Sequence, residues 1–412
     1  MTVILGAGIT GLSVAYHLNK KNKDFIIIEK GKTPGGLCRN INIDGYVFNY
    51  TGHFLHCRTE YVNELARKLM PDIKAIKRSS FIYLGERIIP YPIQANISYL
   101  PFFSRIKTLT GYIFRNKNEP TNLRDWFISS FGRGLYDVFF CAYNQKLWKY
   151  PLEEISPDFL KVYVPKYSFG SADRNIGYNA EFLYPRGGIG ELVSSLSRDI
   201  EVLHGEVRKV DDNYVYFDKG DIRYDRLIST IPLPEFLRMF TLGENKPDKA
   251  SLIWNSVLCI NIGIEGELSF KNNDSDSSDF HWIYFPEKKY PFYRVGSLSN
   301  VSSELVPPGH SSVWVEISYR EQPPDENIVD SVIDNLVQIG LFKKDSVVHV
   351  SKVNIPYAYP IYDKKRENTI REIYDFLNNY NITLAGRFGK WEYSYMEESI
   401  LEGKSIADLL CP

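Results

Sequence analysis

The sequence predicts an α/β protein in which a parallel sheet, a helical insert and a separate antiparallel sheet are combined. Three observations support this fold class. A strand, a glycine-rich turn and a helix follow one another within the first 20 residues. Aromatic-rich helical patterns interrupted by prolines fill roughly residues 80–180. From Ser251 to Pro360, several runs alternate between apolar and polar residues, which is typical of antiparallel strands.

Length and composition limit what the chain can be. Its 412 residues correspond to two or three domains at roughly 150 residues per domain. The 49 Lys and Arg residues nearly balance the 50 Asp and Glu residues, so the chain has no overall field that attracts nucleic acid or an anionic membrane. No apolar run approaches the roughly 20 residues that span a bilayer. We therefore expect no nucleic-acid partner and no membrane insertion.

The cysteine and histidine positions argue against disulfides and metals. The five cysteines are widely spaced and form no CxxC motif, which does not suit a disulfide framework or a zinc site. His53 and His56 have HxxH spacing, but no third ligand is evident nearby. We expect a cytoplasmic protein without a metal.

The amino-terminal residues predict a dinucleotide-binding turn. Residues 3–5 are apolar, and the GxGxxG motif of Gly6, Gly8 and Gly11 separates them from a helical pattern. In such a motif the first glycine makes a tight turn, the second admits a pyrophosphate, and the third lets helix and strand pack closely. A second apolar run ends in Glu29, whose carboxylate can accept hydrogen bonds from a ribose. A plain glycine turn with a surface glutamate is the alternative.

The next segment carries paired glycines, Gly35 and Gly36, within residues 33–39, followed by residues 44–48 and by Gly52-His53. It resembles the FAD-binding signature of the flavoprotein superfamily that includes amine oxidases, protoporphyrinogen oxidase and UDP-galactopyranose mutase. The paired glycines let the chain pass against the cofactor, which side chains would block. The resemblance implies that the bound dinucleotide is FAD.

Two later segments agree with this signature. Residues 225–232 resemble the strand that returns to the FAD domain, and residues 385–389 resemble the segment before its C-terminal helix, expected from Ser399 to Leu410. The FAD domain is then discontinuous. We expect a Rossmann-like FAD-binding domain of the glutathione-reductase type, a mainly helical substrate and flap domain, and an antiparallel β-sheet substrate domain. Their expected limits are 1–77, 186–245 and 376–412 for the first, 78–185 for the second and 246–375 for the third.

Seven further blocks resemble UDP-galactopyranose mutase, more the eukaryotic than the bacterial form, in their order and spacing. The blocks are residues 90–98, 143–148, 184–190, 282–287, 291–294, 359–360 and 386–393. The resemblance implies an isomerase that interconverts pyranose and furanose forms of a nucleotide-diphosphate sugar, either UDP-galactose or a related UDP- or TDP-sugar. Family members supply furanose sugars for cell-surface polysaccharide.

In that family, reduced FAD attacks the anomeric carbon through its N5 atom, the nucleotide diphosphate leaves, and a covalent flavin–sugar iminium forms. The reaction involves no net redox change. NADPH or NADH is the expected reductant, and homo-oligomerisation is left open. An FAD-dependent oxidase or desaturase of the amine oxidase superfamily is the alternative function. A non-catalytic nucleotide-sugar or FAD-binding subunit is a third.

The resemblance also implies roles for single residues. Arg294 and His53 are the expected catalytic residues, Arg294 on the diphosphate and His53 beside the flavin, where it senses the redox state. The implied substrate-binding residues are Tyr91, Gln94, Phe139, Asn144, Asn179, Trp282, Tyr284, Arg294, Tyr359 and Tyr393. The implied cofactor-binding residues are Gly6, Gly8, Ile9, Thr10, Gly11, Glu29, Gly35, Gly36, Leu37, Cys38, Gly52, His53, Arg78, Ser80, Val207, Gly386 and Arg387. Arg387 contacts the cofactor diphosphate or, alternatively, caps a buried salt bridge.

The chain departs from the family at the diphosphate site. A second family arginine aligns with Tyr163, and a family tyrosine aligns with Val301. A charge-assisted hydrogen bond contributes about 1.5–3 kcal/mol, so these changes imply weaker diphosphate binding. Lys161 and Lys166 lie close enough in sequence to substitute for the arginine.

Overall fold

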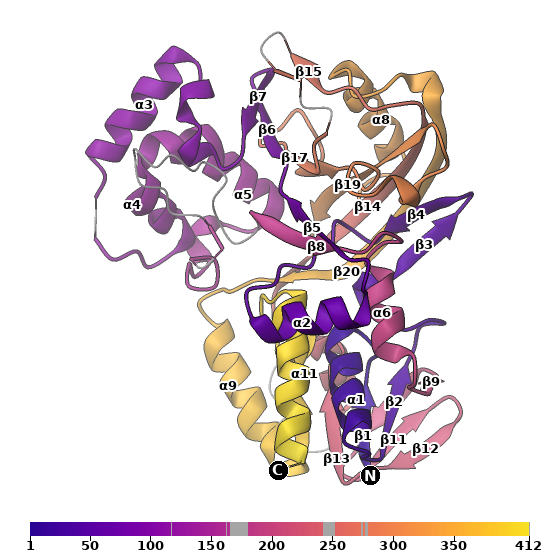
Figure 1. Ribbon diagram of the computed structural model, residues 1–412. Coiled ribbons are helices and arrows are strands. Elements are labelled where there is room, and N and C mark those ends of the chain that lie inside the picture. Colours follow the sequence, from indigo (N-terminus) through magenta and orange to yellow (C-terminus); the bar gives the residue numbers. More distant parts are fainter. Residues whose placement is uncertain are drawn as a thin grey trace.

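The computed structural model describes residues 1–116, 118–161, 163–164, 180–241, 252–272, 275–276 and 279–411. Both chain ends lie in one part of the molecule, around a parallel sheet (Figure 1). A large, mostly antiparallel sheet and a group of helices lie side by side at the opposite end of the molecule. This arrangement confirms the predicted fold class.

The parallel sheet is assembled from segments far apart in the sequence. Its strand order is β21-β13-β1-β2-β9, and every neighbouring pair is parallel. The strands are β1 (Thr2–Leu5), β2 (Phe25–Glu29), β9 (Val202–His204), β13 (Arg226–Ser229) and β21 (Ile382–Leu384). Alternate residues of a strand point to opposite faces, and both faces of this sheet are covered. Ile4 packs with the core that includes α1 (Ile9–Lys20) and α11 (Met396–Leu410), whereas Val3 and Leu5 pack with the core that includes α7 (Leu233–Met239) and α9 (Arg366–Leu377).

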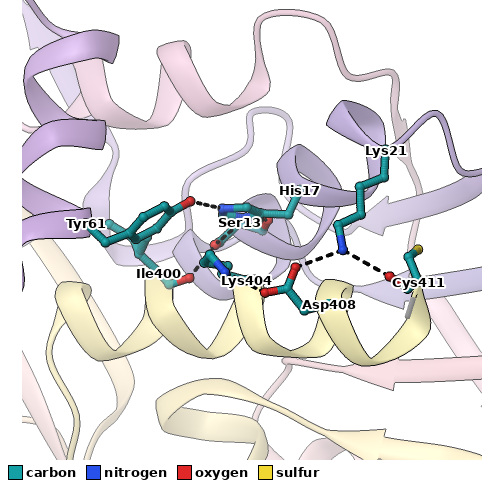
Figure 2. A network of polar contacts seen from close by, with 8 residues as sticks. All are labelled: Ser13, His17, Lys21, Tyr61, Ile400, Lys404, Asp408 and Cys411. Atoms are coloured by element: carbon teal, nitrogen blue, oxygen red, sulfur yellow. Dashed lines mark hydrogen bonds and ion pairs between the residues drawn. The ribbon is translucent and has the colours of Figure 1, made fainter.

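Helix α11 holds α1 in position through polar contacts that Figure 2 shows. The Ser13 hydroxyl donates to the Ile400 carbonyl at 2.7 Å, and Lys21 pairs with Asp408 at 2.8 Å. His17 Nδ1 lies 2.6 Å from the Ser13 carbonyl, which can only accept, so Nδ1 carries the proton. Since α1 begins beside the glycine turn, these contacts also fix that turn.

The second sheet has the order β20-β14-β19-β18-β17-β6-β7 and is antiparallel except for the parallel pair β17–β6. Its strands are β6 (Ser80–Leu84), β7 (Arg87–Pro90), β14 (Trp254–Glu265), β17 (Trp282–Tyr284), β18 (Arg294–Gly296), β19 (His310–Tyr319) and β20 (Val347–Pro360). Val313, Val315 and Ile317 of β19 pack with helix α8 (Ile328–Gln338) in one core. The intervening Trp314 and Glu316 therefore point to the opposite face.

Strands β6 and β7 come from the segment expected to be mainly helical. They form a hairpin around Gly85 and Glu86, whose φ values are +57° and +60°. Two consecutive residues with positive φ are typical of the tight turns that match the twist of a hairpin. The apolar runs on either side of this turn pair with each other and extend the large sheet.

The helical group contains the aromatic segments that the sequence predicts as helices. It consists of α3 (Phe102–Ile113), α4 (Leu123–Leu135), a π-helical segment at Tyr136–Phe140 and α5 (Cys141–Trp148). Asn122 caps the start of helix α4, and its side chain accepts a hydrogen bond from the Asp125 amide at 2.9 Å. Such a cap satisfies an amide that would otherwise lack a partner at the helix start.

Smaller elements complete the fold. The remaining strands are β3 (Asn40–Ile43), β4 (Tyr46–Asn49), β5 (Lys74–Lys77), β8 (Glu181–Tyr184), β10 (Val207–Val210), β11 (Tyr214–Phe217), β12 (Gly220–Arg223), β15 (Lys271–Asn272) and β16 (Ser275–Asp276). The remaining α-helices are α2 (Glu60–Leu69), α6 (Gly190–Ser197) and α10 (Gly386–Gly389). Within the described ranges, no helix combines the length and apolar character needed to cross a bilayer.

Candidate active site

A cavity of about 840 Å³ extends from the glycine turn to the large sheet and the helical group. Its wall includes Gly8 after β1, Glu29 at the end of β2, Asn144 on α5, Arg294 on β18 and Tyr359 on β20. The carboxyl ends of β1 and β2 open into it, which is the usual binding position in parallel α/β sheets. Residues from all parts of the sequence thus share one cavity.

The three glycines of the amino-terminal turn are required for different reasons. Gly6 has φ +93°, a conformation that side chains rarely adopt. A Cβ atom on Gly11 would lie 2.0 Å from the Gly6 carbonyl oxygen, so Gly11 allows α1 to pack on the turn. A Cβ atom on Gly8 would meet no protein atom within 4 Å, yet Gly8 lines the cavity. Protein packing does not explain the glycine at position 8, whereas a ligand phosphate close to the backbone does.

A second glycine pair lies against the first turn. Gly35 and Gly36 both have positive φ, and a Cβ atom on Gly36 would lie 3.3 Å from the Cα atom of Gly8. The Gly35 amide donates to the Ala7 carbonyl at 2.7 Å. The Glu29 carboxylate accepts from the amides of Ala7 and Gly31 at 2.9 and 2.7 Å, which holds it at the end of β2. These features fit the adenosine and pyrophosphate portion of FAD.

Most residues predicted to bind the cofactor line the cavity. They are Gly6, Gly8, Ile9, Thr10, Glu29, Gly35, Gly36, Leu37, Cys38, Gly52, His53, Val207 and Arg387. Gly11, Arg78, Ser80 and Gly386 do not line it. Gly386 instead supports the wall from behind, because a Cβ atom there would lie 2.4 Å from the hydroxyl of Thr10.

His53 is held as a neutral imidazole within the cavity wall. Burial is the largest cause that lowers the pKa of its side chain, to about 4. The Thr51 hydroxyl lies 3.2 Å from its Nδ1 atom. The preceding Gly52 allows a close approach to Trp314, whose ring would lie 2.3 Å from an added Cβ atom. A neutral imidazole at this position can exchange a proton with a bound group without introducing a fixed charge.

Arg294 forms a bidentate ion pair with a fully buried carboxylate. Its Nη2 and Nε atoms lie 2.7 and 3.0 Å from the two oxygens of Glu316, its neighbour in the β18–β19 register. The Tyr293 hydroxyl and the Trp314 indole also donate to Glu316. Among the described residues, no hydrogen-bond acceptor engages Nη1 of Arg294. The guanidinium is therefore fixed in direction and keeps donors for a ligand.

Tyrosines surround Arg294 and keep their hydroxyl protons. Burial raises the pKa of Tyr359 to about 12 and also raises the pKa values of Tyr91 and Tyr284. The rings of Tyr359 and Tyr393 stack with centroids 5.9 Å apart. The guanidinium of Arg387 lies 5.1 and 4.7 Å from the centroids of these two rings. This wall offers several hydrogen-bond donors and two cations to an anionic ligand.

Arg387 is oriented by backbone carbonyls and not by a carboxylate. It donates to the carbonyl oxygens of Ser394 at 2.8 Å and Ala358 at 3.1 Å. Neither bond neutralises its charge. Of the two roles expected for this arginine, a contact with the cofactor diphosphate agrees better with this geometry than capping a salt bridge.

The predicted substrate-binding residues fall into three groups. The cavity wall includes Tyr91, Phe139, Asn144, Trp282, Tyr284, Arg294, Tyr359 and Tyr393. Gln94 is buried but does not line the cavity. Asn179 lies outside the described residues. The protein itself uses both ends of the Asn144 amide, which donates to the Phe140 carbonyl and accepts from the Trp148 indole.

The two departures from the family pattern lie in different surroundings. Tyr163 lines the cavity, and its hydroxyl is 3.4 Å from both the Tyr393 carbonyl and a carboxylate oxygen of Glu398. Val301 does not line the cavity. Lys161 pairs with Asp158 at 2.7 Å, which reduces its availability to a ligand. Lys166 lies outside the described residues.

Sequence reasoning missed several residues of the site. Glu316, Tyr293 and Trp314 form the buried support of Arg294, while Tyr143 and Arg39 line the cavity. One signal was available for Glu316, because it is a lone acid within the apolar strand His310–Tyr319. A charge in such a strand requires a buried partner. In the part of the chain that the structure describes, no group of His, Cys, Asp or Glu is arranged to hold a metal ion.

Comparison with known proteins agrees with this geometry. Residues 4–69 match the family model of an NAD(P)-binding Rossmann-like domain. The crystal structure of reduced UDP-galactopyranose mutase superposes with a TM-score of 0.91, is 27% identical, and is matched over 99% of this chain and 93% of that chain. A coproporphyrinogen III oxidase from Staphylococcus aureus is 24% identical over 98% of this chain and 97% of its own length. A putrescine oxidase structure is 14% identical over 100% and 99% of the two chains, with a TM-score of 0.68.

The fold is that of FAD-dependent mutases and oxidases, and the glycine-lined groove fits a dinucleotide cofactor. Among these folds, the chain is similar to UDP-galactopyranose mutase over nearly its whole length. The resemblance that the sequence indicates is thereby confirmed.

Proposed function

We propose that this chain is a flavin-dependent mutase that interconverts the pyranose and furanose forms of a nucleotide-diphosphate sugar. The observation that carries the proposal is a cavity that joins the glycine turn to a wall of tyrosines around Arg294. The 27% identity to UDP-galactopyranose mutase supports it. UDP-galactose is the first candidate substrate, and another UDP- or TDP-hexose is the next.

Each part of the cavity then has a task. When bound in its reduced form, FAD would supply the nucleophile for the anomeric carbon. Arg294 binds the diphosphate of the substrate, the hydroxyls of Tyr359 and Tyr393 donate hydrogen bonds to it, and Arg387 binds the diphosphate of the cofactor. Holding the diphosphate fixes the distance between the sugar and the cofactor, which is the main contribution that positioning makes to such a reaction. Phe139 and Trp282 supply apolar surface that excludes water.

The test is turnover by the reduced protein. Purified protein is reduced once with dithionite, supplied with UDP-galactofuranose and then with TDP-sugars, and the products are separated by chromatography while oxygen is monitored. We expect many turnovers for a single reduction and no oxygen consumed per product. Oxygen consumption in step with product would indicate the alternative oxidase, and the absence of turnover with every sugar would refute the mutase proposal.

A conservative variant tests the role of Arg294. Arg294→Lys keeps a positive charge beside Glu316 but removes the donors that face the cavity, so the ion pair and the fold are preserved. We expect UDP affinity to fall by about ten- to a hundred-fold, since a charge-assisted hydrogen bond is worth about 1.5–3 kcal/mol. The matched control is Arg186→Lys, because Arg186 forms an exposed pair with Glu304 and does not line the cavity. Titration calorimetry measures both affinities, and equal values would show that Arg294 does not bind the diphosphate.

A further inference from the structure

Helix α3 presents its apolar side to solvent. Phe102, Phe103, Ile113 and Phe114 are 66%, 83%, 69% and 84% exposed, and Ile106 between them is also exposed. In the described part of the chain, seven of the eleven exposed large hydrophobic side chains lie between Tyr99 and Phe114. A surface helix of a globular protein normally turns such residues toward the core. The orientation of α3 is therefore the reverse of the usual one.

The inner side of α3 explains why the helix cannot rotate to bury these residues. This side carries Thr108 and Gly111, which are small, and packs against α4. A Cβ atom on Gly134 of α4 would lie 2.1 Å from the Lys107 carbonyl oxygen, and one on Gly111 would lie 2.6 Å from the Gly134 amide. The backbones of the two helices are thus in direct contact. Large apolar side chains do not fit between them, so α3 keeps its apolar side outward.

Positive charges border this apolar side. Residues 99–116 contain Arg105, Lys107 and Arg115 but no acidic residue. Successive residues of a helix are separated by roughly 100°, so Arg105 and Lys107 lie on either side of Ile106 at the centre of the apolar stripe. Lys107 forms an ion pair with Asp137 at 2.9 Å but is 56% exposed. Exposed phenylalanines flanked by cations are characteristic of helices that lie in the surface of a membrane.

We propose that the outward side of α3, formed by Phe102, Phe103, Ile106, Ile113 and Phe114, docks on an anionic lipid bilayer. The phenylalanine rings enter the boundary between headgroups and acyl chains, and the flanking cations contact anionic headgroups. Helix α3 lies at the outer edge of the molecule (Figure 1), so a flat surface can reach it. Pairing with a second copy is less favourable, because residues 99–116 of the two copies would bring six cations together with no acid of their own, and Asp137 pairs with Lys107 alone among them.

Vesicle binding tests the proposal. The full chain is sedimented with vesicles of phosphatidylcholine alone and of phosphatidylcholine mixed with phosphatidylglycerol. We expect binding to the mixed vesicles, weakening as salt is added, and little binding to the neutral ones. The double variant F103S/F114S should reduce binding at least ten-fold, because both side chains are exposed and contribute little to the core. The matched control is Leu409→Ser, which removes a 77% exposed side chain from α11.

Folding and self-association are measured in parallel. The double variant should retain the circular dichroism spectrum and the unfolding midpoint of the parent chain, which shows that any loss of binding is local. Absence of binding to the anionic vesicles, or equal binding by the parent and the double variant, would overturn the proposal. A dimer of the parent chain in sedimentation equilibrium that the double variant loses would also overturn it, in favour of self-association.

Discussion

Gly8 and Gly11 lie three residues apart in one motif, and each position requires glycine for a different reason. The backbone of Gly8 has φ −74°, which any residue adopts, and the space beside it belongs to the cavity. Gly11 faces the carbonyl oxygen of Gly6. The first glycine therefore serves a ligand, and the second serves the packing of α1 against the turn.

Alanine at each position should separate these two requirements. We expect Gly8→Ala to leave the unfolding free energy of the cofactor-free protein within about 1 kcal/mol, since glycine-to-alanine changes at compatible dihedral angles are small or stabilising. Its affinity for FAD should fall at least ten-fold. Gly11→Ala should lose several kcal/mol of stability because its methyl group would overlap the Gly6 carbonyl. Urea unfolding and flavin fluorescence measure the two quantities, and an undiminished FAD affinity in Gly8→Ala would contradict the assignment of the pyrophosphate to this turn.

Arg294 illustrates the limit of residue-by-residue prediction. Its place in a motif predicts a contact with the substrate, and the structure puts it in the cavity wall. Its ion pair with Glu316 depends on the register of β18 and β19, which lie together only in the folded sheet. Gln94 comes from a motif as well, but it is buried and does not line the cavity, so its predicted contact with the substrate stays a prediction. A motif identifies the segment, whereas the direction of each side chain depends on how the segments pack.

At the scale of elements, Lys146 connects α5 to the loop between β17 and β18. Its ammonium group donates to the carbonyl oxygens of Phe285, Glu287 and Phe292 at 2.7, 2.5 and 3.1 Å. All three donors of the ammonium group are therefore used. Since Tyr284 and Arg294 lie on the two strands that this loop connects, Lys146 also holds the cavity wall in place.

Replacing Lys146 should weaken this connection. In Lys146→Met three buried carbonyl groups lose their donor, at a cost of about 1–3 kcal/mol each. Part of this cost is offset, because the variant no longer has to transfer a charged group from water into the protein interior. We expect a net loss of about 3 kcal/mol in unfolding free energy and weaker UDP binding. Lys149→Met is the matched control, because Lys149 is exposed at the end of the same helix. Equal urea midpoints for the two variants would show that the loop holds its position without Lys146.

The elements were predictable to different degrees. Local patterns predict β1, α1 and β2, because a glycine turn between apolar runs has few alternatives. The helices of the aromatic segment also agree with their sequence pattern. The β6–β7 hairpin did not follow from the broad helical pattern around it, although its Gly85-Glu86 turn was visible in the sequence. The reversed orientation of α3 depends on the glycine contact with α4, which no pattern within α3 alone could indicate.

At the scale of the whole molecule, burial of neutral histidines couples stability to pH. His56 and His281 are both buried, and burial is the largest cause that lowers the pKa of each to about 4. His56 Nδ1 lies 3.1 Å from the Glu181 carbonyl, and His281 Nδ1 accepts from the Ser79 amide at 3.1 Å. The first bond fixes one ring proton and the second requires an unprotonated nitrogen. With the pKa of each ring lowered by burial, both rings are neutral in the folded protein at pH 7.

The sign of the pH dependence follows from this state. In the unfolded chain these histidines titrate near pH 6.5, so between pH 6.5 and about 4 the unfolded chain binds protons that the folded protein does not. Stability is then complete above pH 6.5 and falls as the pH is lowered, by up to about 1.4 kcal/mol per pH unit for each histidine. Below about pH 4 their contribution is constant. His17 and His53 act in the same direction, because burial lowers their pKa values as well.

Urea unfolding of the cofactor-free protein at several pH values between 7 and 4 measures this slope. The variant His281→Asn offers the Ser79 amide an oxygen acceptor that does not titrate. Its unfolding free energy should therefore change less with pH than that of the parent chain, and the difference is the contribution of one histidine. The carboxyl of Asp408 does not account for this window, because its bonds to Lys21 and Lys404 lower its pKa to about 2, and burial raises the pKa of Glu402, which acts in the opposite direction. A stability that stays constant from pH 6.5 to 5 in the parent would show that water reaches these rings and that the folded protein tolerates their charge.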